Sequence, residues 1–420
     1  MKLSEIVEFN PSTPLRRGTV APFVDMASLP TTERYFRITE TREFKGSGSK
    51  FRDGDTLLAR ITPCLENGKG GFVRGLGRGV AAHGSTEFIV LRPKKTSDAD
   101  FVYYVTRHPD FRSFAIKQMS GTSGRQRVAW QALTDYELVD LTPFERAALG
   151  SLLSALDDKI ELNRRMNATL EAMARAIFRD WFVDFGPTRA KMQGREPYLA
   201  PDLWPLFPAL LNDQGIPEGW QMGMLGDVAE TNARSWTAKN HPDEVEYVDL
   251  SNTKWGTIES TAKLPWEKAP SRARRIARAG DTIIGTTRPG NGSFAYISRD
   301  GLTVSTGFAV LTPKRPEFRD FVYIAASDPE NIRRLANLAD GHGGAYPAVR
   351  PAEVSDTPVV VPSDEVVDAF AKAVSPLRAR IEFNKTKNET LAQTRDLLLP
   401  RLMSGELRVA EAEKIVEGGV

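Results

Sequence analysis

The chain contains an internal repeat, and this repeat constrains its architecture more than any other feature. Residues 160–170 (IELNRRMNATL) return as residues 381–391 (IEFNKTKNETL). Flanking segments recur at nearly the same offset, so that residues 101–104 match 321–324. A repeat of this length is too long for a solenoid and indicates a duplicated module. A duplicated module predicts two similar sites in one chain.

Each half of the sequence is interpreted as a mixed module followed by a long helix. Short apolar runs such as residues 56–59 and 87–91 are separated by Gly, Pro and Ser clusters, which is typical of strands and turns. A helix is predicted at about 98–118 from its apolar spacing. The duplication is clearest in the predicted strands and weakest in the loops. This is the pattern expected when one scaffold presents two different recognition surfaces.

The first long helix is predicted from an apolar seam. Its apolar residues run from Leu149 to Trp181 in steps that alternate between four and three, which is a heptad pattern. Thr142, Pro143 and Glu145 form the signature of a capped helix start. Gly186–Pro187 is expected to stop this helix.

The second long helix keeps the same phase from Phe370 to Leu402. Ser363 is a suitable start, because Asp364 and Glu365 would then occupy the first turn. We expect a kink or a restart near Pro376 and near Pro400, since proline removes a helical hydrogen bond.

Two seams of equal length in one chain can pair with each other. The module between the helices returns the chain to its beginning, so the pairing is expected to be antiparallel. That arrangement would bring Asn163 and Asn167 together with Asn384 and Asn388 as a buried layer that fixes the register; alternatively, these residues face solvent at a break in the seam. The 33 residues of the first seam would span roughly 50 Å at ~1.5 Å per residue.

The sequence thus predicts an α+β protein with two similar globular α/β domains, separated by a long antiparallel two-helix coiled coil and related by a pseudo-two-fold axis. The predicted segments are the first module (1–143), the first helix (144–185), a Pro-rich connector (186–217), the second module (218–362), the second helix (363–404) and a tail (405–420).

Composition and motifs exclude several kinds of chemistry. The chain has one cysteine, Cys64, and no apolar leader, so a reducing compartment and a cytoplasmic location are expected. The four histidines lack metal-ligand spacing, and no phosphate loop or dinucleotide fingerprint occurs. We therefore predict no catalytic residue and no metal site in this chain. A net charge of +2 neither requires nor excludes a nucleic-acid partner.

Three stretches carry a family resemblance. Residues 156–185, including LDDKIELNRRMN, resemble the central conserved region of type I restriction–modification specificity subunits. Residues 216–228 resemble the usual opening of a target-recognition domain, and residues 398–407 resemble the C-terminal conserved end of the family. One departure is that residues 3–10, which align with 225–232, have no Gly-Trp before them.

The resemblance implies a function that the residues alone leave open. Each module would be a target-recognition domain for one half of a bipartite, asymmetric site in double-stranded DNA, and the coiled coil would set the spacer. Two modification subunits, which are methyltransferases, would dock on the helices, and restriction subunits with ATP-dependent translocase and nuclease activity would join them. S-adenosylmethionine, Mg²⁺ and ATP would be bound by these partners, and this chain would be non-catalytic, without a cofactor or a membrane association.

Candidate DNA-binding residues are polar or cationic side chains in the variable loops. In the first module they are Arg60, Asn67, Lys69, Arg74, Thr122, Ser123, Arg125, Gln126 and Arg127. In the second module they are Thr287, Arg288, Asn291, His342, Tyr346 and Arg350. The alternative is that these loops are ordinary solvated turns. The basic run at 272–278 is either a phosphate-contacting edge or a solvated face.

Two other functions compete with this interpretation. An autonomous nucleic-acid-modifying enzyme would methylate or cleave DNA without partner subunits. A scaffold that binds only proteins would show no salt-dependent shift of DNA in a gel, whereas DNA contacts release counterions and weaken steeply with salt.

Overall fold

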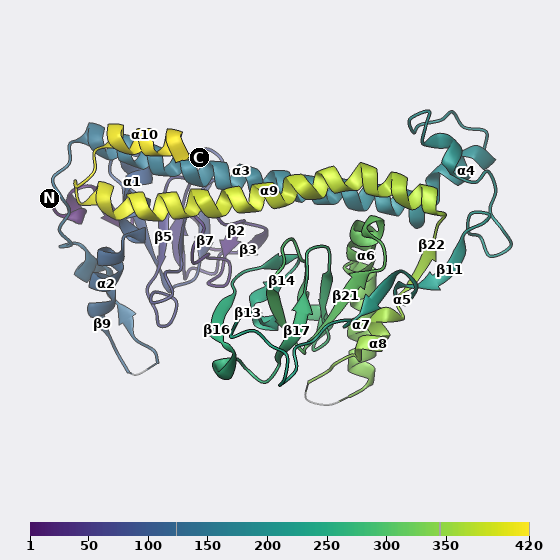
Figure 1. The fold of residues 1–420 in the computed structure, drawn as a ribbon. Coiled ribbons are helices and arrows are strands. Elements are labelled where there is room, and N and C mark those ends of the chain that lie inside the picture. Colours follow the sequence, from purple (N-terminus) through teal and green to yellow (C-terminus); the bar gives the residue numbers. More distant parts are fainter. Residues whose placement is uncertain (123, 344–345, 420) are drawn as a thin grey trace. The chain divides into compact units, whose positions relative to one another are not determined.

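The computed structural model describes residues 1–122, 124–343 and 346–419. These residues form two units: the first consists of Met1–Arg165 with Asn384–Val420, and the second of Met166–Phe383. Each unit contains one module and one half of each long helix (Figure 1).

The first unit contains two four-stranded sheets, with the strand orders β1-β8-β5-β6 and β3-β2-β7-β4. The strands are β1 (Val7–Phe9), β2 (Val20–Val24), β3 (Glu40–Glu43), β4 (Ser49–Phe51), β5 (Thr56–Ala59), β6 (Gly70–Phe72), β7 (Ala82–Gly84) and β8 (Phe88–Pro93). Strands β2 and β7 are parallel, and the other neighbours are antiparallel. Helices α1 (Ala99–Arg107) and α2 (Pro109–Lys117) follow, and then the short strands β9 (Met119–Ser120) and β10 (Arg127–Val128) form a hairpin.

The second unit repeats this plan, with the strand orders β12-β21-β18-β19 and β16-β13-β20-β17. The strands are β12 (Ala229–Thr231), β13 (Glu244–Val248), β16 (Ala262–Pro265), β17 (Ala273–Ala277), β18 (Thr282–Gly285), β19 (Phe294–Tyr296), β20 (Leu302–Ser305) and β21 (Phe308–Pro313). Two further pairs are β11 (Gln221–Met224) with β22 (Pro358–Val361), and β14 (Thr253–Lys254) with β15 (Thr257–Ile258). The short helices are α5 (Leu225–Val228), α6 (Arg319–Ala326), α7 (Pro329–Gly341) and α8 (Pro351–Ser355).

The matching strand orders confirm the duplication that the repeated sequence predicts. Each unit even repeats one unusual residue, an asparagine in the left-handed region: Asn10 has a φ of 47° and Asn232 has a φ of 57°. Each side chain accepts the N–H of a residue in the neighbouring strand, Val90 or Val310. An asparagine tolerates this backbone because its short polar side chain bonds locally.

The two long helices are α3 (Pro143–Phe182) and α9 (Asp364–Met403). The predicted start of α3 is confirmed, because the N–H of Glu145 donates to the Thr142 hydroxyl (3.2 Å) while the Glu145 carboxylate accepts the N–H of Thr142 (2.8 Å). These bonds lower the pKa of Glu145, since they stabilise its charged form. The predicted start of α9, directly after Ser363, is also confirmed.

Within each unit the two helices pack antiparallel, as predicted. In the first unit Asp157 contacts Arg395, and six residues further along α3 the Asn163 side chain donates to the Asn388 side chain (2.8 Å). In the second unit Asn167 donates to the carbonyl of Ile381 (3.4 Å). As the residue numbers rise along α3, the numbers of the residues that they contact in α9 fall, which is the pattern of an antiparallel pair. Asn163 and Asn384 are buried, and Asn167 and Asn388 are half-buried.

Two local predictions are wrong, and a third is wrong in part. Helix α9 is continuous through Pro376 and Pro400, so the predicted restart is absent. Residues beside each proline, such as Val374 and Leu399, pack in the core, and this packing outweighs the cost of about 3 kcal/mol for an interior proline. Gly186–Pro187 does not end α3, which already stops at Phe182, but begins helix α4 (Gly186–Met192). The helix expected at 98–118 is two helices, broken where Pro109 starts α2 and the His108 ring caps it.

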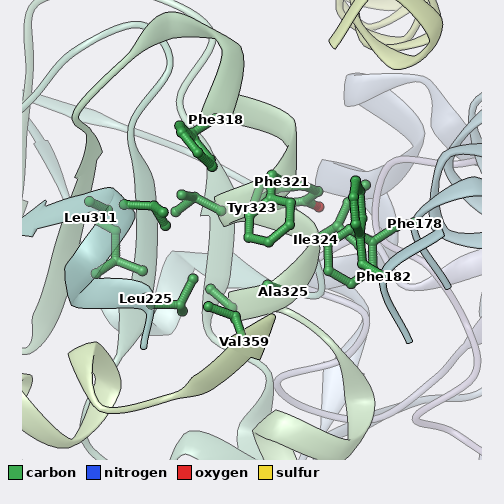
Figure 2. Packing of buried hydrophobic residues seen from close by; sticks show 14 of the residues in the cluster. Phe178, Phe182, Leu225, Leu311, Phe318, Phe321, Tyr323, Ile324, Ala325 and Val359 are labelled. Atoms are coloured by element: carbon green, nitrogen blue, oxygen red, sulfur yellow. The ribbon is translucent and has the colours of Figure 1, made fainter. Parts of the chain in front are cut away.

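Segments outside the two modules are also ordered. In the first unit, helix α10 (Val409–Gly419) places Ala412 in the same apolar cluster as Leu149 and Leu402. In the second unit, Phe207 of the connector packs edge-on against Trp181 at a centroid distance of 4.9 Å. Figure 2 shows how Phe178 and Phe182 of α3 lie against Phe321 and Ile324 of α6. These aromatic contacts fasten the second module to its half of the helix pair.

Candidate nucleic-acid interface

In the first module, the loop that follows β5 meets the end of the β9–β10 hairpin. Ile61 and Arg127 form an isolated bridge, and the N–H of Thr62 donates to the carbonyl of Gln126 (3.0 Å). The N–H of Val128 donates to the carbonyl of Arg60 (2.9 Å). These two paired segments are called the first loop pair. Their backbone pairing brings together Arg60, Gln126 and Arg127, although Arg60 lies far from the other two in the sequence.

One carboxylate orients the two arginines of this loop pair. Arg127 donates three hydrogen bonds to Glu87 (2.8–3.0 Å), and Arg60 lies 3.9 Å from the same carboxylate. The hydrogen bonds raise the pKa of Arg127, because they stabilise the cation. The Arg127 side chain remains 41% exposed, and its Nη1 also donates to the carbonyl of Arg125 (3.3 Å).

The tip of the hairpin is a short exposed turn. The N–H of Arg125 donates to the carbonyl of Thr122 (3.0 Å), and both side chains are exposed. Ser123 lies outside the described residues. This turn places the predicted residues Thr122 and Arg125 beside Gln126 and Arg127.

Three other predicted residues of this module occupy different places. Asn67 is exposed on the turn before β6. Lys69 directs its Nζ to the carbonyl of Met26 (2.9 Å). Arg74 donates to Asp158 of α3 (2.8 Å). The structure therefore does not bring Lys69 and Arg74 into the loop pair, and it engages both cations within the protein.

The second module builds its loop pair at the corresponding place. Thr287, after β18, bridges to Ala348, and the N–H of Arg288 donates to the carbonyl of Pro347 (2.8 Å). The guanidinium of Arg288 lies 5.3 Å from the ring centre of Tyr346, and both residues are exposed. Asn291 is exposed on the following turn. Four predicted residues are thus gathered here: Thr287, Arg288, Asn291 and Tyr346.

Glu353 orders the remaining two predicted residues. Its carboxylate lies 3.1 Å from His342 Nε2 and 3.2 Å from the Arg350 guanidinium. It also accepts the N–H of Arg350 (2.7 Å). The backbone hydrogen bond is the main reason why the pKa of Glu353 is lowered. His342 Nδ1 lies 3.0 Å from the Ala348 carbonyl, so His342 joins the same loop pair.

Comparisons with known proteins give this geometry a context. Residues 217–393 match the family model described as the type I restriction modification DNA specificity domain. The specificity subunit of the type I restriction enzyme HindI of Haemophilus influenzae is 25% identical, over 88% of this chain and 90% of that protein. The MjaIX specificity subunit of Methanocaldococcus jannaschii is 22% identical, over 76% and 71%.

The chain is similar to type I restriction–modification specificity subunits along most of its length. The fold agrees, because the crystal structure of the S subunit from M. genitalium covers 96% of this chain and 95% of its own, with a TM-score of 0.51 at 15% identity. Specificity subunits recognise DNA. Within the type I restriction–modification complex they are non-catalytic and carry no cofactor.

The basic run at 272–278 lies on the edge strand of its sheet. Residues 273–277 form strand β17. Burial lowers the pKa of Arg275, whose guanidinium donates to the Asn232 side chain. Arg272 pairs with Asp249 (2.7 Å), and Arg274 stacks on Trp266 at 4.3 Å. These contacts engage three of the four arginines of the run within the second module.

Sequence reasoning did not single out one exposed residue that lies beside the second loop pair. Trp255 is 63% exposed and packs on Gly292, directly after Asn291. A tryptophan between two short strands resembles an ordinary core residue in the sequence. The only available signal was the neighbouring Gly256, which marks a turn.

Among residues 1–122, 124–343 and 346–419, no group of three or more His, Cys, Asp or Glu residues is placed to hold a metal ion. Over the same ranges, no helix combines the length and the apolar character that crossing a membrane requires.

Proposed function

We propose that each module recognises one half of a bipartite, asymmetric DNA sequence. The first reading module is assigned to residues 1–143 and the second to residues 218–362. The helices at 144–185 and 363–404 set the length of the spacer DNA between the half-sites, whose sequence is not recognised. They also provide the docking surface for modification subunits. The asparagines at 163, 167, 384 and 388 hold the register of this helix pair.

One observation carries the proposal: the two modules form a loop pair at the same topological position but equip it with different side chains. The bridge between Ile61 and Arg127 in the first module corresponds to the bridge between Thr287 and Ala348 in the second. The first loop pair presents Arg60, Gln126 and Arg127, and the second presents Arg288 and Tyr346. A shared scaffold with different chemistry at one position is what two distinct DNA specificities require.

The side chains fit the chemistry of base recognition. Arginine donates two hydrogen bonds to guanine, and asparagine or glutamine pairs with adenine in the major groove. Arg127 and Gln126 in the first module, and Arg288 and Asn291 in the second, are the candidates for such contacts. Other exposed polar groups, such as Thr122, would fix the register on the phosphates.

The helices have a suitable length for a spacer. Two readers on the same face of a duplex lie about one helical turn apart, ~34–36 Å. Helix α3 has 40 residues, which correspond to roughly 60 Å at ~1.5 Å per residue. A helix pair of that length is long enough to hold two readers one turn apart.

Partner subunits complete the activity. Two modification subunits that bind S-adenosylmethionine would methylate the recognised DNA. Restriction subunits that use ATP and Mg²⁺ would join them. This chain would supply the sequence selection, and its partners the catalysis.

The methylation pattern of the source genome, measured at single-base resolution with and without this gene, tests the proposal. We expect one bipartite motif to lose its methylation when the gene is absent. Exchanging residues 218–362 for the second module of another specificity subunit should then alter one half of the motif and leave the other half unchanged. A change in both halves, or in neither, would refute the assignment of one half-site to each module.

A further inference from the structure

An exposed tryptophan in the second module has an unusual backbone. Trp255 follows β14 and precedes Gly256 and β15, and its φ of 47° lies in the left-handed region. This conformation is uncommon for a bulky side chain and costs free energy. Trp255 is 63% exposed, so burial offsets little of this cost.

The protein nevertheless holds the indole in a defined place. The N–H of Trp255 donates to the carbonyl of Gly292 (2.7 Å), and the indole lies directly over this glycine. A Cβ atom at Gly292 would come within 2.5 Å of the ring. The edge of Phe294 supports it at a centroid distance of 5.9 Å. Gly292 is therefore the residue that leaves room for the indole.

The neighbouring turn shows the same combination of strain and exposure. Arg288 has a φ of 48° and stacks on Tyr346, a residue that is 74% exposed. Trp255 and Arg288 thus flank the turn formed by Pro289–Asn291. Conformations of this kind cluster at ligand-binding sites, where the surrounding structure holds a side chain ready for its partner. Tryptophan and tyrosine are also enriched among the residues that dominate binding energies.

The first module carries a different side chain at the equivalent glycine. Gly68 lies two residues before Gly70, which pairs with Leu58, just as Gly292 lies two residues before Phe294, which pairs with Ile284. A Cβ at Gly68 would meet the Arg112 guanidinium at 2.8 Å. The two modules therefore place a cation and an indole on corresponding glycines.

We propose that Trp255 makes an apolar contact with a base in the half-site that the second module recognises. This inference rests on the proposed function, since it assumes that the second loop pair faces DNA. The strained backbone and the bare surface of Gly292 hold the indole in its binding position before DNA arrives. Apolar side chains distinguish base edges by contact, most clearly at the thymine methyl group.

Selection of binding sites from random double-stranded DNA, with the full-length chain at a fixed salt concentration, tests this inference. The variants are Trp255→Gly and Trp255→Phe, and the control is Met222→Ala, which truncates another exposed side chain of the same module. We expect the wild-type chain to enrich a bipartite motif. Trp255→Gly should lose at least tenfold of its base preference at one or two adjacent positions of one half-site, and Trp255→Phe should retain most of that preference. Met222→Ala should enrich the wild-type motif.

Thermal unfolding separates a binding role from a structural one. Glycine adopts a positive φ freely, so Trp255→Gly should keep or raise the Tm while it loses base preference. A lower Tm together with a loss across the whole half-site would assign Trp255 a structural role and overturn the inference. An unchanged motif in Trp255→Gly would overturn it as well, and would leave the proposed function standing. If the wild-type chain enriches no motif, the proposed function fails and the inference fails with it.

Discussion

The two modules contain the same aromatic cage for an arginine, but they obtain the arginine from different places. In the first module Asp100 pairs with Arg34, and the guanidinium lies 4.5 Å from the ring centre of Phe72 and 5.4 Å from that of Tyr103. Arg34 comes from a loop of the module itself, so this cage is complete without the long helices.

The second module fills the equivalent cage from α9. Arg378 pairs with Asp320 (2.9 Å) and stacks on Tyr323 at 4.3 Å and on Tyr296 at 5.0 Å. It also pairs with Glu171 of α3 (3.0 Å). A single buried side chain therefore joins the second module to both helices of its unit.

The helix position that corresponds to Arg378 in the first unit is Asp157, which has the opposite charge. Asp157 accepts the hydroxyl hydrogen of Tyr104 and pairs with Arg395 of α9. Each module is thus fitted to the charge that its own helix presents. Two modules with one fold are therefore not equivalent in how they attach to the helices.

Arg378→Met is the substitution with the largest expected effect. It leaves Asp320 and Glu171 without their shared cation, and removing one partner of a buried ion pair costs about 3–5 kcal/mol. Hydrogen exchange should therefore accelerate in the α6 amides, whereas exchange in α1 should stay unchanged. Adding Asp320→Asn should recover part of the protection, because the buried charge is then removed. Equal acceleration in α1 and α6 would contradict the assignment of Arg378 to the second module alone.

Arg34→Met should have a smaller effect. Its partner Asp100 is 37% exposed, so water can solvate the carboxylate once the cation is lost. We expect a cost of about 2 kcal/mol, from the lost charged hydrogen bond and the lost stacking. The measurement is the exchange rate of the α1 amides, with α6 as the internal control. If Arg34→Met accelerated exchange in α1 more than Arg378→Met accelerates it in α6, the expected order of the two effects would be wrong.

The smallest expected effect on stability comes from a second difference between the modules, which is the partner of a buried aspartate. Asp55 of the first module pairs with Arg92 (2.7 Å), whereas strand β21 of the second module has Thr312 at the corresponding position. Burial raises the pKa of Asp281, the counterpart of Asp55. A raised folded-state pKa contributes stability at acidic pH, and this contribution is lost as the pH rises through the folded pKa.

Asp281→Asn should remove this pH dependence. The free energy of unfolding of the wild-type chain, relative to the variant, should therefore fall as the pH rises from below the unfolded pKa of about 4 towards neutrality. Denaturant unfolding followed in the second unit at several pH values measures this difference. A difference that grows with pH would contradict the raised pKa.

Local sequence signals predicted much of the fold. The repeat predicted the duplicated module, the heptad seam predicted the helices, and Thr142 with Glu145 predicted the start of α3. These features depend on neighbours within a few residues or on direct comparison of the two halves. Proline was a less reliable guide, because α9 continues through Pro376 and Pro400 where tertiary packing holds the helix.

Features that depend on long-range pairing escaped prediction. Arg34 and Asp100 are far apart in the sequence, as are Trp255 and Gly292, and no local pattern links either pair. The candidate interface was predicted in part: Arg127 and Arg288 lie in the two loop pairs, but Arg74 turns to Asp158. A cation in a loop looks the same in a sequence whether it faces a ligand or an internal carboxylate.

The cage around Arg378 sets a compatibility rule for chimaeric proteins. A foreign domain grafted in place of the second module must offer a carboxylate and two aromatic rings where α9 delivers its guanidinium. A donor domain that already supplies its own arginine, as the first module does with Arg34, would force two cations into one cavity. Screening donor sequences for these three residues before cloning would separate grafts that seat correctly from those that do not.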